Sequence, residues 1–171
     1  MDASRPGWRP LTRVADALEW LLLAVGTTAF ALLVLTVGAQ VFARNVLAMG
    51  LGWTLDLAQL LFTWCIFLGA AIAVRRRVHY QVDLLPPSWL RVQALLGLIA
   101  FAASAVVVYV MIASGLIMIE ISGRRFNQAL GISGAWFYAA IPVSAAAAAF
   151  FLLEQAVTEL RRLVGGEPGP A

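Results

Sequence analysis

Charged residues are scarce in this sequence. Only 12% of the 171 residues are charged, whereas an average soluble domain has about 25%. So few charges cannot solvate the surface of a globular domain, and the 62% of residues that are hydrophobic suit a lipid environment instead. The composition therefore favours a membrane protein.

Lysine, cysteine and histidine are absent or nearly so. Lysine does not occur, and Cys65 and His79 are the single residues of their kinds. A lone cysteine excludes an internal disulfide and a thiolate metal cluster. A lone histidine cannot supply the paired axial ligands of a membrane haem protein. We therefore expect this chain to bind no cofactor.

What the sequence does contain is long uncharged runs. Each is long enough for a helix to cross a hydrocarbon core of about 30 Å, and continuous apolar runs favour helices over a β-barrel. The prediction is an all-α membrane protein with one membrane domain, residues 1–171, and four transmembrane helices. The uncharged runs are 20–43, 57–74, 92–119 and 126–153. The spans expected from them lie near 18–46, 54–75, 91–119 and 135–158.

The twelve arginines are unequally divided between the two sides of these spans. Nine lie before the first uncharged run, between the second and the third, or after the fourth (Arg5, Arg9, Arg13, Arg75, Arg76, Arg77, Arg91, Arg161 and Arg162), and three lie in the other two connections (Arg44, Arg124 and Arg125). By the positive-inside rule, both termini and loop 75–90 are cytoplasmic. The run Arg75, Arg76 and Arg77 then acts as a topology anchor. Because the arginines flank spans instead of lining a groove, we expect membrane lipids and not nucleic acid as partners.

Amphipathic segments are predicted at both ends of the chain. Within residues 2–19, apolar side chains recur at Leu11, Val14, Ala15 and Leu18, the spacing of one helical face. We expect this segment to lie along the cytoplasmic membrane surface and to bend into the first span. The segment EQAVTELRRLV after the last span has a similar character.

Ionisable groups are missing from the second, third and fourth uncharged runs. A carrier that moves ions within its own bundle usually exposes such groups at mid-depth. A self-sufficient carrier is therefore disfavoured, and a subunit that works with a partner is favoured. Arg44 and Asp56 flank the first outer loop, and their position at the ends of adjacent helices suggests an ion pair between them.

His79 and Asp83 lie four residues apart in the cytoplasmic loop. On a helix they would share a face, and such a dyad at a membrane surface is the basis of one functional alternative, an enzyme using acid/base chemistry. The other interpretation is structural: the two side chains cap the loop or pair with the neighbouring arginines. Neither a nucleophile nor an oxyanion arrangement accompanies them, which favours the structural interpretation.

The segment GWTLDLAQLLFTWCIFLGAAIAVRRRVHYQVDLLP carries a more specific pattern. With the preceding VFARNVL, it resembles the DctQ-like small permease subunits of tripartite ATP-independent periplasmic (TRAP) transporters. That family has an arginine ending the first helix, a tryptophan followed by acids opening the second, an aromatic run, and a basic H-x-x-V-D loop. The matching positions are Arg44, Trp53, Asp56, Leu61 to Ala71, Arg75, His79, Val82 and Asp83.

The resemblance implies a function. In such a system a periplasmic binding protein delivers an organic acid to a large permease subunit, which imports it with sodium across the bacterial inner membrane. The small subunit would be an accessory scaffold, not an enzyme, with sodium coupling in the large subunit. The candidates for large-subunit contact or a structural role are Arg44, Trp53, Asp56, Gln59, His79 and Asp83.

Arg124 and Arg125 are an unusual basic pair for a loop on the outer side. We expect them to help dock an acidic edge of the binding protein, an association that salt would weaken. Contact with lipid headgroups or with Glu120 is the alternative, since exposed ion pairs often contribute little.

Overall fold

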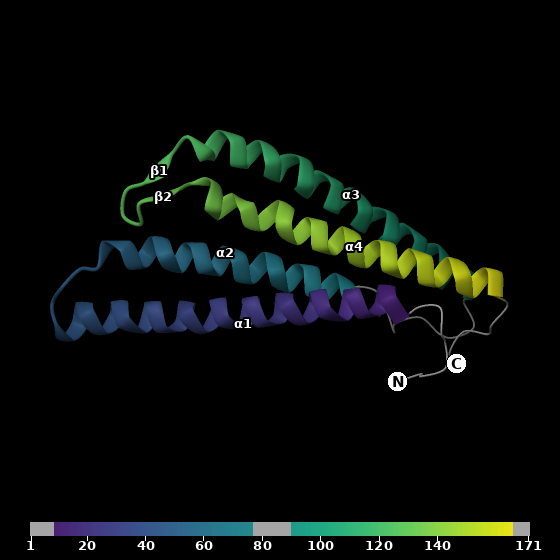
Figure 1. Cartoon of the computed structure of the whole chain (residues 1–171), viewed down its shortest axis with the longest axis horizontal. Coiled ribbons are helices and arrows are strands. Elements are labelled where there is room, and N and C mark those ends of the chain that lie inside the picture. Colours follow the sequence, from purple (N-terminus) through teal and green to yellow (C-terminus); the bar gives the residue numbers. More distant parts are fainter. Residues whose placement is uncertain (1–8, 77–89, 166–171) are drawn as a thin grey trace.

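Four long helices and one short hairpin make up the protein (Figure 1). This computed structural model describes residues 9–76 and 90–165, and the side chains of residues 12–76 and 99–157. Its elements are α1 (Arg9–Val46), α2 (Gly52–Arg75), α3 (Leu90–Gly123), β1 (Phe126–Asn127), β2 (Ile132–Ser133) and α4 (Ala135–Gly165). The predicted four-helix architecture is confirmed, and the hairpin is an addition to it.

Each helix contains a stretch long and apolar enough to cross a membrane. The mean hydropathy of these stretches lies between 1.8 and 2.3, and a length of 18 or more apolar residues is typical of transmembrane helices. The protein is therefore a multi-pass helical membrane protein. The stretches are Thr12–Val46, Gly52–Arg75, Ile99–Gly123 and Ala135–Val157.

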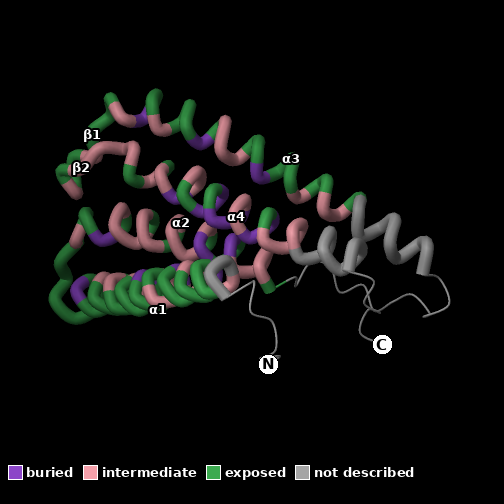
Figure 2. The backbone as a smooth tube through the Cα atoms, turned by 45° about the vertical axis from the view of Figure 1, so that its right-hand side comes forward, coloured by how far each residue is buried: buried purple, intermediate pink, exposed green. Residues whose placement is uncertain are grey.

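The helices lie in the spatial order α1, α2, α4, α3 (Figure 1). α1 packs on α2, α2 on α4, and α4 on α3, with a smaller contact between α1 and α4. In its apolar stretch α4 has 39% of residues buried, against 11% in α1 and in α3. α4 is thus the most enclosed helix, and α1 and α3 form the two flanks, as the burial colours of Figure 2 show.

α1 runs without interruption from Arg9 to Val46. The expected bend between a surface segment and the first span is therefore absent within this range. Ala15 is fully buried, and Asp16 and Glu19 are held by arginines of α2. These contacts fasten the first turns of α1 to the bundle, so the helix continues straight where the sequence suggested a turn onto the membrane surface.

The buried core is built largely from alanine. Small side chains let helix backbones approach closely, which is the usual packing mode in membranes. The largest fully buried apolar side chains are Phe151 of α4 and Leu68 of α2. The core cluster consists of Ala15, Leu22, Leu68, Ala71, Val108, Ala147, Ala148, Phe151 and Leu152.

Gly115 of α3 packs closely against α4. A Cβ atom added there would lie 2.8 Å from Cδ of Pro142 and 3.2 Å from its backbone nitrogen. Pro142 lies inside α4, where its ring leaves one carbonyl of the preceding turn without a helical donor. The glycine therefore provides the space that the proline ring of the neighbouring helix occupies.

The β1–β2 hairpin closes the connection between α3 and α4. Oδ1 of Asn127 accepts hydrogen bonds from the backbone N–H groups of Ala129 (2.9 Å) and Leu130 (3.0 Å). Gly131 has a φ of 65°, a left-handed conformation that glycine adopts without steric cost. The N–H of Gly134 donates to the carbonyl of Arg125 at 2.8 Å. The turn is therefore ordered by its own hydrogen bonds.

Replacing Gly115 with alanine should destabilise the α3–α4 contact. The added methyl group meets a rigid ring and backbone, so we expect a loss of about 1–3 kcal/mol, the usual cost of overpacking. Thermal unfolding of the purified protein in detergent measures this loss. Gly38→Ala is the matched control, because nothing lies within 4 Å of a Cβ added at that position. Equal melting temperatures for the two variants would contradict the close approach.

Candidate functional site

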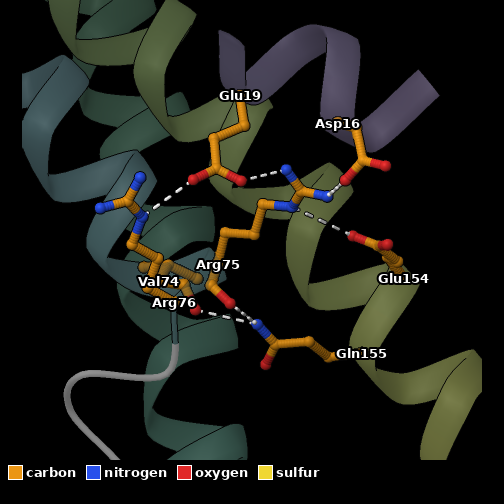
Figure 3. Close-up of polar contacts among 7 residues, drawn as sticks. All are labelled: Asp16, Glu19, Val74, Arg75, Arg76, Glu154 and Gln155. Carbon is orange, nitrogen blue, oxygen red and sulfur yellow. Dashed lines mark hydrogen bonds and ion pairs between the residues drawn. The ribbon is translucent and has the colours of Figure 1, made fainter. Parts of the chain in front are cut away.

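Arg75 is the centre of a charged cluster at one end of the bundle (Figure 3). It is the last residue of α2, and its side chain is only 12% exposed. A helix of 24 residues is roughly 36 Å long at about 1.5 Å per residue, so its final residue lies near the membrane boundary and not at mid-depth. An enclosed guanidinium at this boundary requires counter-charges.

Two carboxylates from α1 provide part of this counter-charge. Asp16 and Glu19 are three residues apart, so both project from the same face of the helix. One terminal nitrogen of Arg75 lies 2.5 Å from Oδ1 of Asp16, and the other is hydrogen-bonded to Oε2 of Glu19. The guanidinium therefore spans two carboxylates of a neighbouring helix.

α4 contributes a third carboxylate and an aromatic ring. Oε2 of Glu154 lies 3.7 Å from Nε of Arg75. Phe151, one helical turn earlier, places its ring centroid 5.3 Å from the Cζ atom of Arg75. This is the geometry of a cation–π contact. The guanidinium is therefore contacted by α1 on one side and by α4 on the other.

Gln155 connects α4 to the backbone end of α2. Its Nε2 donates to the carbonyl oxygen of Val74 at 2.8 Å and to that of Arg75 at 3.3 Å. The last carbonyls of a helix have no partner within the helix. A side chain of α4 thus caps the end of α2 beside the ion pairs.

Arg76 completes the cluster at the surface. Its Nε lies 2.8 Å from Oε1 of Glu19, so that carboxylate is shared by two arginines. The side chain of Arg76 is 55% exposed, whereas those of Glu19 and Glu154 are 19% and 13% exposed. Among the described side chains, three carboxylates face two guanidinium groups. The pair with Arg76 is therefore hydrated, as is the pair of Arg75 with Asp16, whose side chain is 71% exposed, while the pairs of Arg75 with Glu19 and Glu154 are largely enclosed.

This arrangement can hold α1, α2 and α4 in a fixed relation. Each carboxylate already faces an arginine, and within residues 12–76 and 99–157 no group of three metal-ligating side chains is present. The cluster has the chemistry of a structural clamp. The predicted topology anchors Arg75 and Arg76 are thus also bonded inside the bundle, while Arg77, His79 and Asp83 lie outside the described residues.

The other candidate residues from the sequence lie at the opposite end of α1 and α2. Arg44 and Gln59 are exposed, Trp53 is 45% exposed, and Asp56 is half-buried. Among the described side chains, Arg44 and Asp56 do not form the suggested ion pair: the described ion pairs are those of Arg75 and Arg76. The suggestion of an ion pair between Arg44 and Asp56 was therefore wrong, because their places at the ends of adjacent helices do not bring the charged groups together.

Arg124 and Arg125 lie where α3 passes into the β1–β2 hairpin, and both are exposed. The neighbouring Phe126 is 71% exposed. Within the described part of the chain neither arginine is paired with Glu120. The basic pair and an aromatic ring are therefore presented together on the surface.

The sequence reasoning missed Asp16, Glu19, Glu154 and Gln155 as members of a site. A signal was present, because three acids occur at the ends of the first and last predicted spans that the arginine count places on the cytoplasmic side, level with Arg75. The positive-inside rule counts arginines and ignores such acids. Pairing each cytoplasmic acid with an arginine at the same depth would have identified the cluster.

The fold and the cluster define a multi-pass helical membrane protein whose enclosed charges bind its own helices together. The chain belongs to the DctQ family: the family model described as "Tripartite ATP-independent periplasmic transporters, DctQ component" matches residues 33–162. It is thus a small component of a TRAP transporter, and the resemblance seen in its second helix is confirmed. Comparison with curated proteins gave no significant match.

Removing the central guanidinium should loosen the bundle. Arg75→Gln removes the enclosed guanidinium that Glu19 and Glu154 contact. We expect the free energy of unfolding to fall by an amount on the order of 3 kcal/mol, the lower end of the cost of breaking a buried ion pair. Thermal unfolding in detergent measures it. Arg76→Gln is the matched control, with an expected loss below about 1 kcal/mol because its ion pair is hydrated. If the control variant lost as much stability as Arg75→Gln, the central role of Arg75 would be refuted.

Proposed function

We propose that this chain is the static scaffold subunit of a sodium-coupled TRAP transporter in a bacterial inner membrane. The transporter imports organic acids that a periplasmic binding protein delivers. The large permease subunit holds the substrate and sodium sites, and this chain supports it without a substrate site of its own.

The observation that carries this proposal is how the polar groups of the spans are used. The hydroxyl groups of Thr28, Thr36, Thr63 and Ser144 each donate to the carbonyl four residues earlier in the same helix, at 2.6–2.9 Å. Such back-bonding satisfies a hydroxyl within its own helix. The enclosed charges, in turn, are paired at one end of the bundle. These polar groups are therefore engaged in the protein itself and do not line a solute pathway.

The exposed surface also supports a scaffold role. α1 and α3 present large apolar side chains to their surroundings, including Phe30, Leu35, Val106 and Val107. Lipid tails and the apolar faces of other membrane helices both suit such surfaces. No observation on the described residues favours the alternative of a membrane-surface enzyme, and a role for His79 and Asp83 stays a prediction.

Reconstitution into liposomes tests the proposed division of roles. The complete complex, with its binding protein and an inward sodium gradient, should accumulate a radiolabelled organic acid from a panel of dicarboxylates, sugar acids and keto acids. The small subunit alone should give no uptake above that of empty liposomes, because the hydroxyl groups of Thr28, Thr36, Thr63 and Ser144 are bonded within their own helices and the enclosed charges lie at one end of the bundle. Sodium-driven uptake by the isolated small subunit would overturn the proposal.

The surface around Arg124 and Arg125 is proposed to dock the binding protein. Two positive charges beside an exposed aromatic ring fit an acidic edge with an apolar neighbour. The hydrogen-bonded hairpin presents these side chains from an ordered support. Lipid headgroups are the competing partner for the same charges.

The double variant Arg124→Ala, Arg125→Ala should weaken association of the complex with the substrate-loaded binding protein at low salt. The difference in binding-protein affinity between the variant and the unmodified complex should decrease as ionic strength rises, because salt screens exposed charges. Titration of binding across a salt series measures both effects. Gln128→Ala is an uncharged control on the same exposed turn. An affinity unchanged by the double variant at every salt concentration would favour the lipid alternative.

A further inference from the structure

One side of α2 is uncovered in the bundle. The exposed positions of this helix beyond its first turn recur every three or four residues, which places them on a single stripe. We call this stripe the α2 open face; it consists of Leu55, Gln59, Phe62, Ile66, Gly69 and Ala70. The buried positions of α2, Thr54, Leu68 and Ala71, lie elsewhere on the helix. An inner helix of the row therefore keeps one face free.

Gln59 is out of place on such a face. It is seven residues after the start of α2 at Gly52, which corresponds to roughly 10 Å along the helix. Trp53, at the helix start, is 45% exposed and has the character of an interface residue. The amide of Gln59 is therefore below the interface, beside the hydrocarbon.

The Gln59 amide has no partner among the described residues to compensate for this position. Its backbone carbonyl accepts the hydroxyl of Thr63, but its side chain makes no hydrogen bond to any side chain or backbone group that the structure describes. A primary amide has two donors and two acceptor lone pairs, and an unsatisfied polar group in hydrocarbon costs several kcal/mol. Lipid tails cannot satisfy it, whereas a polar group on another membrane helix can.

The residues at the other end of the α2 open face have small side chains. Gly69 and Ala70 are both exposed, and nothing lies within 4 Å of a Cβ atom added to Gly69. Small residues on an open helix face permit close approach of a second backbone, and interhelical hydrogen bonds from amides strengthen such contacts. The α2 open face thus combines two features: an amide without a hydrogen-bond partner among the described residues, and room for a second helix backbone.

We propose that the α2 open face docks a transmembrane helix of the large permease subunit. That helix places a hydrogen-bonding side chain opposite Gln59 and lies close to α2 at Gly69. This inference rests on the proposed scaffold function and specifies the surface through which it acts. The tripartite system to which the family belongs supplies the large subunit as the second membrane component.

A second copy of this chain fits the α2 open face less well. Two copies inserted in the same orientation would be related by an axis normal to the membrane, so each residue would face its own counterpart. Phe62 would then meet Phe62 and Ile66 would meet Ile66, bulky side chain against bulky side chain. Interdigitating helices instead pack large residues against small ones.

Photocrosslinking in the assembled complex identifies the occupant. Phe62 is replaced by benzoylphenylalanine, a bulky aromatic residue on the α2 open face. Phe30 on α1, which is 59% exposed compared with 55% for Phe62, is replaced in the same way as the matched control. The expected result is an adduct with the mass of the large subunit that is stronger from position 62 than from position 30. Equal adducts, or an adduct with a second small subunit, overturn the proposal.

Substitutions test the two parts of the interface. Gln59→Leu should reduce recovery of the large subunit with the tagged small subunit by about threefold to tenfold, the equivalent of one interhelical hydrogen bond. Gly69→Leu should reduce recovery further by blocking close approach. Gly38→Leu on α1 is the matched control, since neither glycine has a neighbour within 4 Å of an added Cβ. Unchanged recovery with Gln59→Leu and Gly69→Leu overturns the assignment.

The unmodified complex separates this inference from the proposed function. If the wild-type small subunit fails to copurify with the large subunit, the scaffold function itself is wrong. If the wild-type complex forms and both α2 variants retain it, the function stands and only the α2 open face is wrongly assigned. The thermal stability of each variant in detergent should equal that of wild type, because these positions are uncovered in the bundle.

Discussion

The enclosed guanidinium of Arg75 is the constraint on which the bundle depends. A cation at the edge of the hydrocarbon is stable only with counter-charges close by, and here two neighbouring helices supply them. Asp16 and Glu19 come from α1 and Glu154 comes from α4. Satisfying one charge therefore fixes three helices relative to each other, and Gln155 adds a cap on the carbonyl end of α2.

The two ends of the bundle are held by different forces. Ion pairs dominate beside Arg75, whereas the α3–α4 connection is ordered by the backbone hydrogen bonds of a small hairpin and by the close contact at Gly115. Between the ends, alanines and a few large apolar residues fill the core. A protein built in this way has a packed interior and apolar flanks.

The sequence was sufficient to predict the number and nature of the helices, because uncharged runs of membrane length have few other structural outcomes. It also carried the family pattern in the second helix. It was not sufficient to show which arginine meets which acid, since that depends on helix rotation and neighbour order. Arg44 and Asp56 illustrate the limit: their sequence positions suggested an ion pair, but the structure forms none between them. The straight course of α1 likewise follows from tertiary contacts of Asp16 and Glu19 that periodicity cannot reveal.

The spatial order α1, α2, α4, α3 differs from the order in which the helices are synthesised. α1 and α2 can associate as soon as both have left the ribosome, with Arg75 already facing Asp16 and Glu19. α3 emerges next, yet its main neighbour α4 has still to be made. During biogenesis the third helix must therefore wait in the bilayer or beside the insertion machinery. Arrival of the fourth helix then forms the α3 contact and brings Glu154 to Arg75 in a single late step.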